Sequence, residues 1–191
     1  MKKVLIVVAH PDDEVLGCGG TIAKFVDKKY RVKVIFLSDG ESSRLKKINH
    51  KQNLYRRNCA IKAMKVLGVK YFSFSSFPDN EFDKVSLLKI TKKIEVEIKK
   101  YNPDIILTHH NSDLNIDHQI TSRAVLTACR PRIRNKVKLI LFFEILSSTE
   151  WNVTSKKNFF NPNWYEDITK YLNIKIKAIK CYKKELRKYP H

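Results

Sequence analysis

Short apolar runs that alternate with longer amphipathic segments constrain the fold of this chain more than any other feature. The first run, Lys3 to Ala9, is continuous and rich in valine and isoleucine, which is typical of a strand buried on both faces of a parallel sheet. Strands are predicted at residues 3–9, 31–37, 70–74, 104–108 and 138–145, and helices at residues 13–29, 53–67, 84–100, 117–128 and 170–188. This alternation implies βαβ units with right-handed crossovers. We therefore predict an α/β fold with a mostly parallel sheet and helices on both faces.

The length of the chain indicates one domain, because a single hydrophobic core serves 191 residues comfortably. We expect this domain to span residues 1–191, with no internal repeat and with residues 147–163 as a long surface segment. The four cysteines are scattered and form no C-x-x-C pair. They are expected to be buried free thiols in a reducing cytoplasm.

No apolar run approaches the roughly 20 residues needed to cross a bilayer. Asp12, Asp13 and Glu14 follow the first apolar run too closely for a secretory signal. The chain is therefore expected to begin at Met1 and to be cytoplasmic.

The formal net charge of +19 can attract nucleic acid, a membrane surface or a phosphorylated substrate. The lysines, however, are spread along the predicted helices, and no nucleic-acid-binding motif accompanies them. We interpret the charge as solvated helix faces and expect no nucleic-acid partner. Peripheral contact with a membrane-linked substrate stays open, as does an oligomeric state.

Two segments place metal-binding side chains directly after predicted strands. One runs from His10 to Glu14 and the other from His109 to His118. Catalytic zinc commonly takes three protein ligands from histidine and carboxylate and keeps a position for water. His10 and Asp13, joined by His118, can supply that set if the two strands are neighbours. Proteins with open parallel sheets bind substrates and cofactors beyond the carboxyl ends of the strands, where these side chains would lie.

Asp12 is adjacent to two of the predicted ligands but is not needed as a third, so it is the predicted general base. A bound cation would lower the pKa of water and polarise a carbonyl oxygen, which makes an amide attackable at ordinary pH. The alternative for the acidic residues is helix capping after Pro11. For His109 or His118 alone, the alternative is a structural histidine. Two histidine-bearing strand ends together favour the metal site.

At these residues the chain resembles the PIG-L/LmbE-like family of zinc N-deacetylases. The similarity covers nearly the whole chain, and the Ala-His-Pro-Asp-Asp-Glu motif at residues 9–14 is highly specific. Further matching motifs are Gly19-Gly20-Thr21, Ser38-Asp39-Gly40-Glu41, Leu67-Gly68, Phe77-Pro78-Asp79-Asn80, Asn102-Pro103-Asp104 and Asp117-His118. The stretch 144–151 and the ending 160–163 to 189–191 are similar to members that act on amino sugars.

The resemblance implies a Rossmann-like fold and hydrolysis of an N-acetyl amide to amine and acetate. It implies Zn²⁺ at the three predicted ligands, although the same ligands also suit Fe²⁺. Arg56 lies about where the family has a substrate-contacting arginine, and Asp39 is a second expected substrate contact. The glutamate usual one turn after that arginine is Cys59 here, so a solvated helix arginine is the alternative for Arg56.

One position departs from the family pattern. Many members have histidine where this chain has Asn115, and that histidine is thought to stabilise the tetrahedral intermediate or to protonate the leaving amine. Asn115 can donate a hydrogen bond to an oxyanion, an effect worth roughly 3 kcal/mol, but it cannot act as an acid. Either Asp12 then returns the proton, or His110 enters from the same loop. Asp117 is expected to orient a neighbouring histidine.

The leading hypothesis is therefore a metal-dependent deacetylase acting on an N-acetylhexosamine that is free, nucleotide-linked or lipid-linked. An amidase acting on a thiol-conjugated or non-sugar amide is the alternative, and a basic binding protein with a vestigial site is a third hypothesis. Aromatic side chains of the C-terminal third can form a wall of a sugar site, with core packing as the default role for most of them; they are Trp151, Phe159, Phe160, Trp164 and Tyr165.

Overall fold

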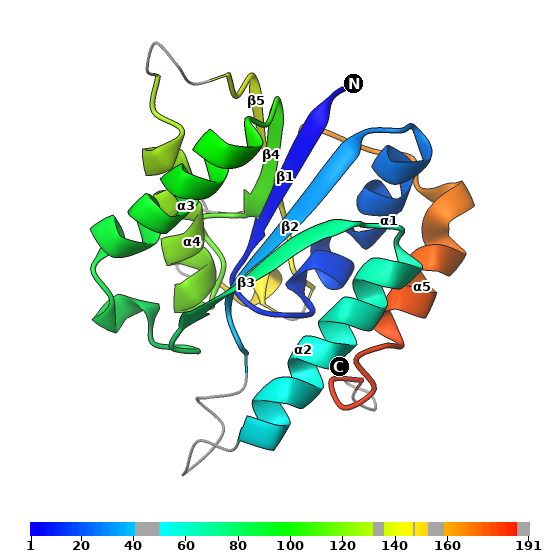
Figure 1. The fold of residues 1–191 in the computed structure, drawn as a ribbon, viewed down its shortest axis with the longest axis horizontal. Coiled ribbons are helices and arrows are strands. Elements are labelled where there is room, and N and C mark those ends of the chain that lie inside the picture. The colour runs from blue at the N-terminus through cyan, green and yellow to red at the C-terminus, as the bar shows by residue number, and fades with distance from the viewer. Residues whose placement is uncertain (41–49, 132–135, 147, 153–158, 187–191) are drawn as a thin grey trace.

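The computed structural model describes residues 1–40, 50–131, 136–146, 148–152 and 159–186. A central sheet lies between two layers of helices (Figure 1). Its strands are β1 (Lys3–Val8), β2 (Arg31–Ser38), β3 (Tyr71–Phe77), β4 (Ile105–His109) and β5 (Leu139–Phe143). They are ordered β3-β2-β1-β4-β5, and every pair is parallel. The predicted α/β fold and parallel sheet are confirmed.

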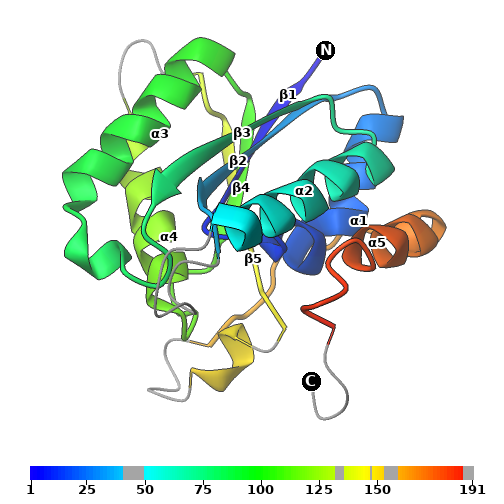
Figure 2. The same cartoon turned by 60° about the horizontal axis from the view of Figure 1, so that its bottom comes forward.

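The helices cover both faces of the sheet, as predicted. One face carries α1 (Asp13–Asp27), α2 (His50–Val66) and α5 (Leu172–Ile179), and the other carries α3 (Leu87–Tyr101) and α4 (Ile116–Ala128), as Figures 1 and 2 show. Short 3-10 helices lie at Phe82–Lys84, Thr149–Trp151 and Thr169–Tyr171. Within the described residues, every helix is too short or too polar to span a bilayer.

The continuous apolar run of β1 feeds two separate cores. Val4 and Ile6 belong to the cluster under α1, α2 and α5, whereas Leu5 and Val7 belong to the cluster under α3 and α4. All four side chains are fully buried. Burial of each stabilises the fold by about 1.5–3 kcal/mol relative to an exposed side chain, so β1 is fixed on both sides.

The last predicted helix, residues 170–188, is wrong in its extent. A 3-10 turn precedes α5, which ends at Ile179. The chain then turns, with the Glu185 amide donating to the Tyr182 carbonyl at 2.8 Å. Tyr182 is only 2% exposed, and its burial beside α1 favours this turn over a longer lysine-rich helix. Residues 187 and 188 lie outside the described part of the chain, as do residues 147 and 153–158 of the expected surface segment.

The strand order reverses at β1, which pairs with β2 on one side and β4 on the other. In open parallel sheets, a crevice opens beyond the carboxyl ends of the strands at such a reversal. The residues that follow β1 and β4 are the two segments that the sequence marks for metal binding. The topology therefore brings them to the same edge of the sheet.

Helix α1 lies close to β5 because Gly17 has no side chain. A Cβ added there would lie 2.3 Å from Cδ2 of Phe143, whose ring is buried. At Gly19 the nearest atom, Cγ of Lys175, would be 3.4 Å away. The close approach at Gly17 thus sets the distance between α1 and the sheet edge.

We expect Gly17→Ala to lower the free energy of unfolding by about 1–3 kcal/mol, because the ring of Phe143 has to shift in a packed core. Gly19→Ala is the matched control and should cost no more than about 0.5 kcal/mol, because its neighbour is flexible and alanine favours helix. Urea denaturation of both variants measures the difference. Equal losses would contradict the close-approach argument.

Candidate active site

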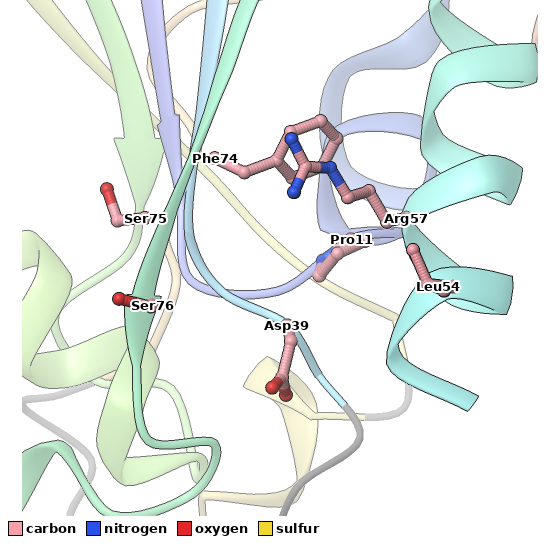
Figure 3. Close-up of a pocket in the computed structure, with 7 residues that line it drawn as sticks. All are labelled: Pro11, Asp39, Leu54, Arg57, Phe74, Ser75 and Ser76. Atoms are coloured by element: carbon pink, nitrogen blue, oxygen red, sulfur yellow. The ribbon is translucent and has the colours of Figure 1, made fainter. Parts of the chain in front are cut away.

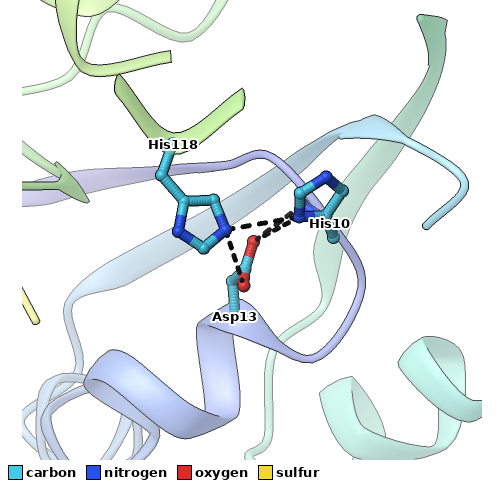
Figure 4. A group of neighbouring side chains, drawn as sticks. All are labelled: His10, Asp13 and His118. Atoms are coloured by element: carbon cyan, nitrogen blue, oxygen red, sulfur yellow. Dashed lines mark hydrogen bonds and ion pairs between the residues drawn. The ribbon is translucent and has the colours of Figure 1, made fainter. Parts of the chain in front are cut away.

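The two predicted segments converge at the carboxyl edge of β1 and β4. The turn from His10 to Asp13 leads from β1 into α1, and the loop after His109 leads from β4 into α4. His118 lies in the first turns of α4 and faces back toward the turn after β1 (Figure 4). Two loops that lie about a hundred residues apart in the sequence thus share one buried site.

The three predicted metal ligands are brought together. Nε2 of His118 lies 3.3 Å from Oδ1 of Asp13 and 3.3 Å from Nδ1 of His10, and that nitrogen of His10 lies 3.5 Å from Oδ2 of Asp13 (Figure 4). All three side chains are buried. Two imidazole nitrogens that face each other across a carboxylate fit a divalent cation, and this set of donors suits Zn²⁺ or Fe²⁺.

The outer nitrogen of each of these histidines faces a second carboxylate. Nε2 of His10 lies 2.9 Å from Oδ2 of Asp117, and Nδ1 of His118 lies 3.1 Å from Oδ1 of Asp113. A carboxylate on the far nitrogen fixes the tautomer and the orientation of a ligating imidazole. Nδ1 of His10 and Nε2 of His118 are therefore the nitrogens that would face a bound cation.

A second group, His10 with Asp79 and Asp117, also has the residue types of a metal site. The backbone fixes Asp117 in another role, because its carboxylate accepts the amides of Asn80 at 2.7 Å and Phe82 at 3.0 Å. Its oxygens are thus engaged by the chain. This favours Asp117 as the residue that orients His10, and the cation site as the one around Asp13.

The charges of this cluster favour a positive centre. Burial alone lowers the pKa of His10, but hydrogen bonds to Asp117 and Asp13 raise it to about 10. Burial likewise lowers the pKa of His118, and the Asp13 carboxylate raises it to about 9. Burial would raise the pKa of Asp13, yet the neighbouring imidazoles hold it well below the ordinary value. The protein surroundings therefore stabilise positive charge where a divalent cation would bind.

The predicted general base, Asp12, lies in an unusual backbone conformation. Its φ is 119° and its ψ is −29°, and its side chain does not cap α1. The alternative of helix capping is therefore wrong for Asp12. Burial raises the pKa of its carboxyl to about 6, against the charge of Arg56, which lowers it.

Arg56 is 4% exposed, so the alternative of a solvated helix arginine is wrong. Its NH2 group donates to Oδ2 of Asp12 at 2.6 Å, and its Nε donates to the Pro11 carbonyl at 2.9 Å. Its NH1 group donates to the Gly40 carbonyl. The structure thus places Arg56 as a clamp on the turn that carries Asp12. The expected direct contact with substrate stays a prediction.

Asn115 and His110 lie beside the cluster rather than inside it. The Asn115 side chain caps α4 by accepting the Asp117 amide at 2.8 Å, and its Nδ2 donates to Oδ1 of Asn80 at 3.0 Å. Nδ1 of His110 lies 2.7 Å from Oγ of Ser112, and its ring packs edge-on against Phe160. The structure does not bring His110 to the three ligands.

His109 was not among the predicted ligands or catalytic residues, but its ring lies against both Asp13 and His118. Its ring stacks on that of His118 with centroids 3.9 Å apart, and its Nε2 accepts the Ala9 amide at 3.0 Å and lies 3.3 Å from Oδ2 of Asp13. Burial lowers the pKa of His109 to about 4, so the ring is neutral. Its position as the last residue of a strand next to β1 is the signal that could have identified it.

A pocket of about 300 Å³ is lined in part by Pro11, which follows His10 in the turn after β1 (Figure 3). The guanidinium of Arg57 lies 4.6 Å above the ring of Phe74 at one end, and Asp39 lies at the other. The remaining lining residues are Leu54, Ser75 and Ser76. The expected substrate contact Asp39 thus lines a pocket that borders the turn carrying Asp12.

None of the five aromatic side chains expected to form a wall of the sugar site lines this pocket. Core packing, the default role, is wrong for four of the five: Trp151, Phe159, Trp164 and Tyr165 are more than half exposed. The fifth, Phe160, packs on His110. The four cysteines are free as predicted, although only Cys18 and Cys59 are buried.

An open parallel sheet with histidines and carboxylates gathered at its reversal point defines a class of α/β proteins with a catalytic centre at the strand ends. Within that class, this chain belongs to the PIG-L family, described as GlcNAc-PI de-N-acetylase, whose profile matches residues 5–129.

Individual relatives agree with this membership. Diacetylchitobiose deacetylase of Thermococcus kodakarensis is 27% identical over 196 residues, which covers 97% of this chain and 70% of the relative. The 4-oxalmesaconate hydratase of Pseudomonas putida is 30% identical over 129 residues, which covers 62% of this chain and 48% of the relative. The structure of N,N'-diacetylchitobiose deacetylase from Pyrococcus horikoshii shares the fold, with a TM-score of 0.79, 22% identity, and coverage of 97% of this chain and 71% of that one.

The carboxylate behind His118 gives a test of the metal site. We expect Asp113→Asn to weaken zinc binding about 10- to 100-fold, because the His118 imidazole loses the carboxylate partner that fixes its orientation and tautomer. Asp167→Asn is the matched control, since both residues accept a threonine hydroxyl but Asp167 is remote from the site. Competition with a chelating dye measures the affinity. Unchanged affinity in Asp113→Asn would contradict the assignment.

Proposed function

We propose that this protein hydrolyses the N-acetyl amide of an amino sugar to the free amine and acetate, with Zn²⁺ held by His10, Asp13 and His118. The sugar can be free, nucleotide-linked or lipid-linked. The observation that carries the proposal is a buried site for a divalent cation with a carboxylate, Asp12, that is adjacent to the ligands but outside their set. Membership of a deacetylase family supports it.

His10, Asp13 and His118 would hold the divalent cation, which would lower the pKa of water toward 7 and polarise the acetyl carbonyl. The protein side chains supply the rest. Arg56 holds Oδ2 of Asp12. We therefore assign the other carboxylate oxygen of Asp12 as the acceptor of the proton from the attacking water. General base catalysis of this kind contributes about 10²- to 10⁴-fold to the rate.

The leaving amine needs a proton, and the geometry favours Asp12 over His110 as its source. Nδ1 of the His110 ring is engaged by Oγ of Ser112, and the ring packs against Phe160 instead of against any of the three ligands. Asn115 donates to Asn80, so a hydrogen bond from Asn115 to an oxyanion would require that contact to break. One carboxyl group that takes the proton from water and returns it to the amine balances the reaction.

The pocket at Pro11 is the proposed place for the part of the sugar that lies away from the acetyl group. It is lined mainly by apolar atoms, and Asp39, Ser75 and Ser76 offer polar groups to sugar hydroxyls. The 27% identical relative is named for a disaccharide of acetylated amino sugars, which agrees with a substrate larger than the amide itself.

The direct test is acetate release from a panel of N-acetylated amino sugars by the zinc-loaded protein. Asp12→Ala should keep about one zinc per chain and lose about 10²- to 10⁴-fold in kcat. A chelator should abolish acetate release by the wild type.

Equal turnover by Asp12→Ala would remove this residue from the mechanism. Acetate release only from a thiol-conjugated or non-sugar amide would favour the alternative amidase. Hydration of 4-oxalmesaconate, the reaction for which the Pseudomonas putida relative is named, without any acetate release would contradict the proposal.

The pocket gives a second prediction. Arg57→Ala should raise KM about tenfold with kcat little changed, because the guanidinium contributes binding that is equal in the ground and transition states. Lys65→Ala, an exposed cation on the same helix, is the control for lost charge and should leave KM unchanged. Unchanged KM in Arg57→Ala for every substrate of the panel would exclude the pocket as the binding site.

A further inference from the structure

The backbone at Asp12 is strained and needs external support. A φ of 119° is rare for a residue with a side chain and costs about 1–3 kcal/mol, so it persists only where neighbouring groups hold it. One such support is Glu14, whose Oε2 accepts the Asp12 amide at 2.9 Å. Glu14 is fully buried and belongs to neither group of candidate ligands. The catalytic turn is therefore tied to the carboxylate that lies two residues ahead.

Glu14 is itself held by the far end of the chain. The hydroxyl of Tyr182 donates to Oε1 of Glu14 at 2.6 Å. Tyr182 is 2% exposed and lies in the turn that follows α5. Both carboxylate oxygens of Glu14 are thus engaged, one by the backbone of Asp12 and one by the C-terminal turn. Glu14 therefore bridges the C-terminal turn and the catalytic turn.

The same C-terminal turn contacts the second support of Asp12. Oε1 of Glu185 lies 3.6 Å from NH1 of Arg56, the arginine that also donates to Asp12 and to the Pro11 carbonyl. Tyr182 and Glu185 are joined by a backbone hydrogen bond of 2.8 Å. The turn therefore reaches Asp12 by two routes, one through its backbone and one through its carboxylate.

We propose that Tyr182 is a positioning residue for catalysis: through Glu14 it holds Asp12 in the strained conformation that directs its carboxylate toward the substrate. The proposal rests on the proposed function, in which Asp12 carries the proton. Loss of the Tyr182 hydroxyl then changes the placement of the base and leaves the three ligands intact. The effect should fall on kcat, because misplaced catalytic groups lose rate without losing ground-state binding.

The chain offers a matched pair of variants. Tyr171 also lies in the C-terminal segment, and its hydroxyl donates to Oδ2 of Asp27, on α1, at 2.9 Å. Tyr182→Phe and Tyr171→Phe each remove one hydroxyl-to-carboxylate bond between this segment and α1 and keep the ring. Only the first bond leads to Asp12.

We expect Tyr182→Phe to lower kcat about tenfold, with KM and zinc content equal to those of the wild type. Tyr171→Phe should keep the wild-type kcat. Glu14→Gln should keep kcat within about threefold, because the amide can still accept from the Asp12 backbone and donate to Tyr182, whereas Glu14→Ala should lose at least as much as Tyr182→Phe. An unchanged kcat in Tyr182→Phe, or a joint loss of zinc content and kcat, would overturn the positioning role.

Amide hydrogen exchange at Asp12 separates this proposal from the proposed function. Tyr182→Phe should speed exchange of the Asp12 amide about tenfold, and Tyr171→Phe should leave it unchanged, whether or not a sugar substrate is turned over. Unchanged exchange in Tyr182→Phe would overturn the bridge. Faster exchange in a protein that releases no acetate would support the bridge and refute the deacetylase.

Discussion

The carboxylate of Asp13 is almost fully desolvated among three imidazoles, and the arrangement of the rest of the site follows from this. A buried carboxylate is costly unless positive charge or hydrogen-bond donors surround it. Here the His10 amide donates to it at 2.8 Å, the rings of His10 and His118, whose pKa values are raised, lie beside it, and the neutral ring of His109 lies on a further side. Those rings come from the ends of β1 and β4 and from the first turns of α4. These rings can meet only if β1 lies beside β4 in the sheet. The strand order is therefore a requirement of the site.

Carboxylates in a second layer turn this cluster into a directed site. Asp117 and Asp113 engage the outer nitrogens of His10 and His118, so the inner nitrogens face one point. A third carboxylate, Glu14, belongs to neither group of candidate ligands and supports the backbone of Asp12. The three consecutive acidic residues Asp12, Asp13 and Glu14 thus serve different purposes, because each side chain has different partners: Arg56, the histidines and Tyr182, respectively. The clamp of Arg56 and the contact from Tyr182 keep the side chains of Asp12 and Glu14 in place.

The fold and the three candidate ligands could be predicted because both follow from local patterns. Apolar runs of strand length specify a parallel sheet, and the residue types at 10, 13 and 118 are those that hold a divalent cation in proteins. Less of the supporting layer was predictable. His109, Asp113 and Tyr182 act through contacts between distant segments, and neither spacing nor composition records which way a side chain points. The last helix was overestimated for the same reason: its helical pattern continues past Ile179, but burial of Tyr182 outweighs it.

The most direct measurement of the central claim is an anomalous diffraction map of crystals loaded with zinc. The account predicts one peak bonded to Nδ1 of His10, Nε2 of His118 and the carboxylate of Asp13, at about 2.0–2.2 Å from each, with Asp12 outside the coordination shell. A peak between His10, Asp79 and Asp117, or one that takes Asp12 as a ligand, would contradict it.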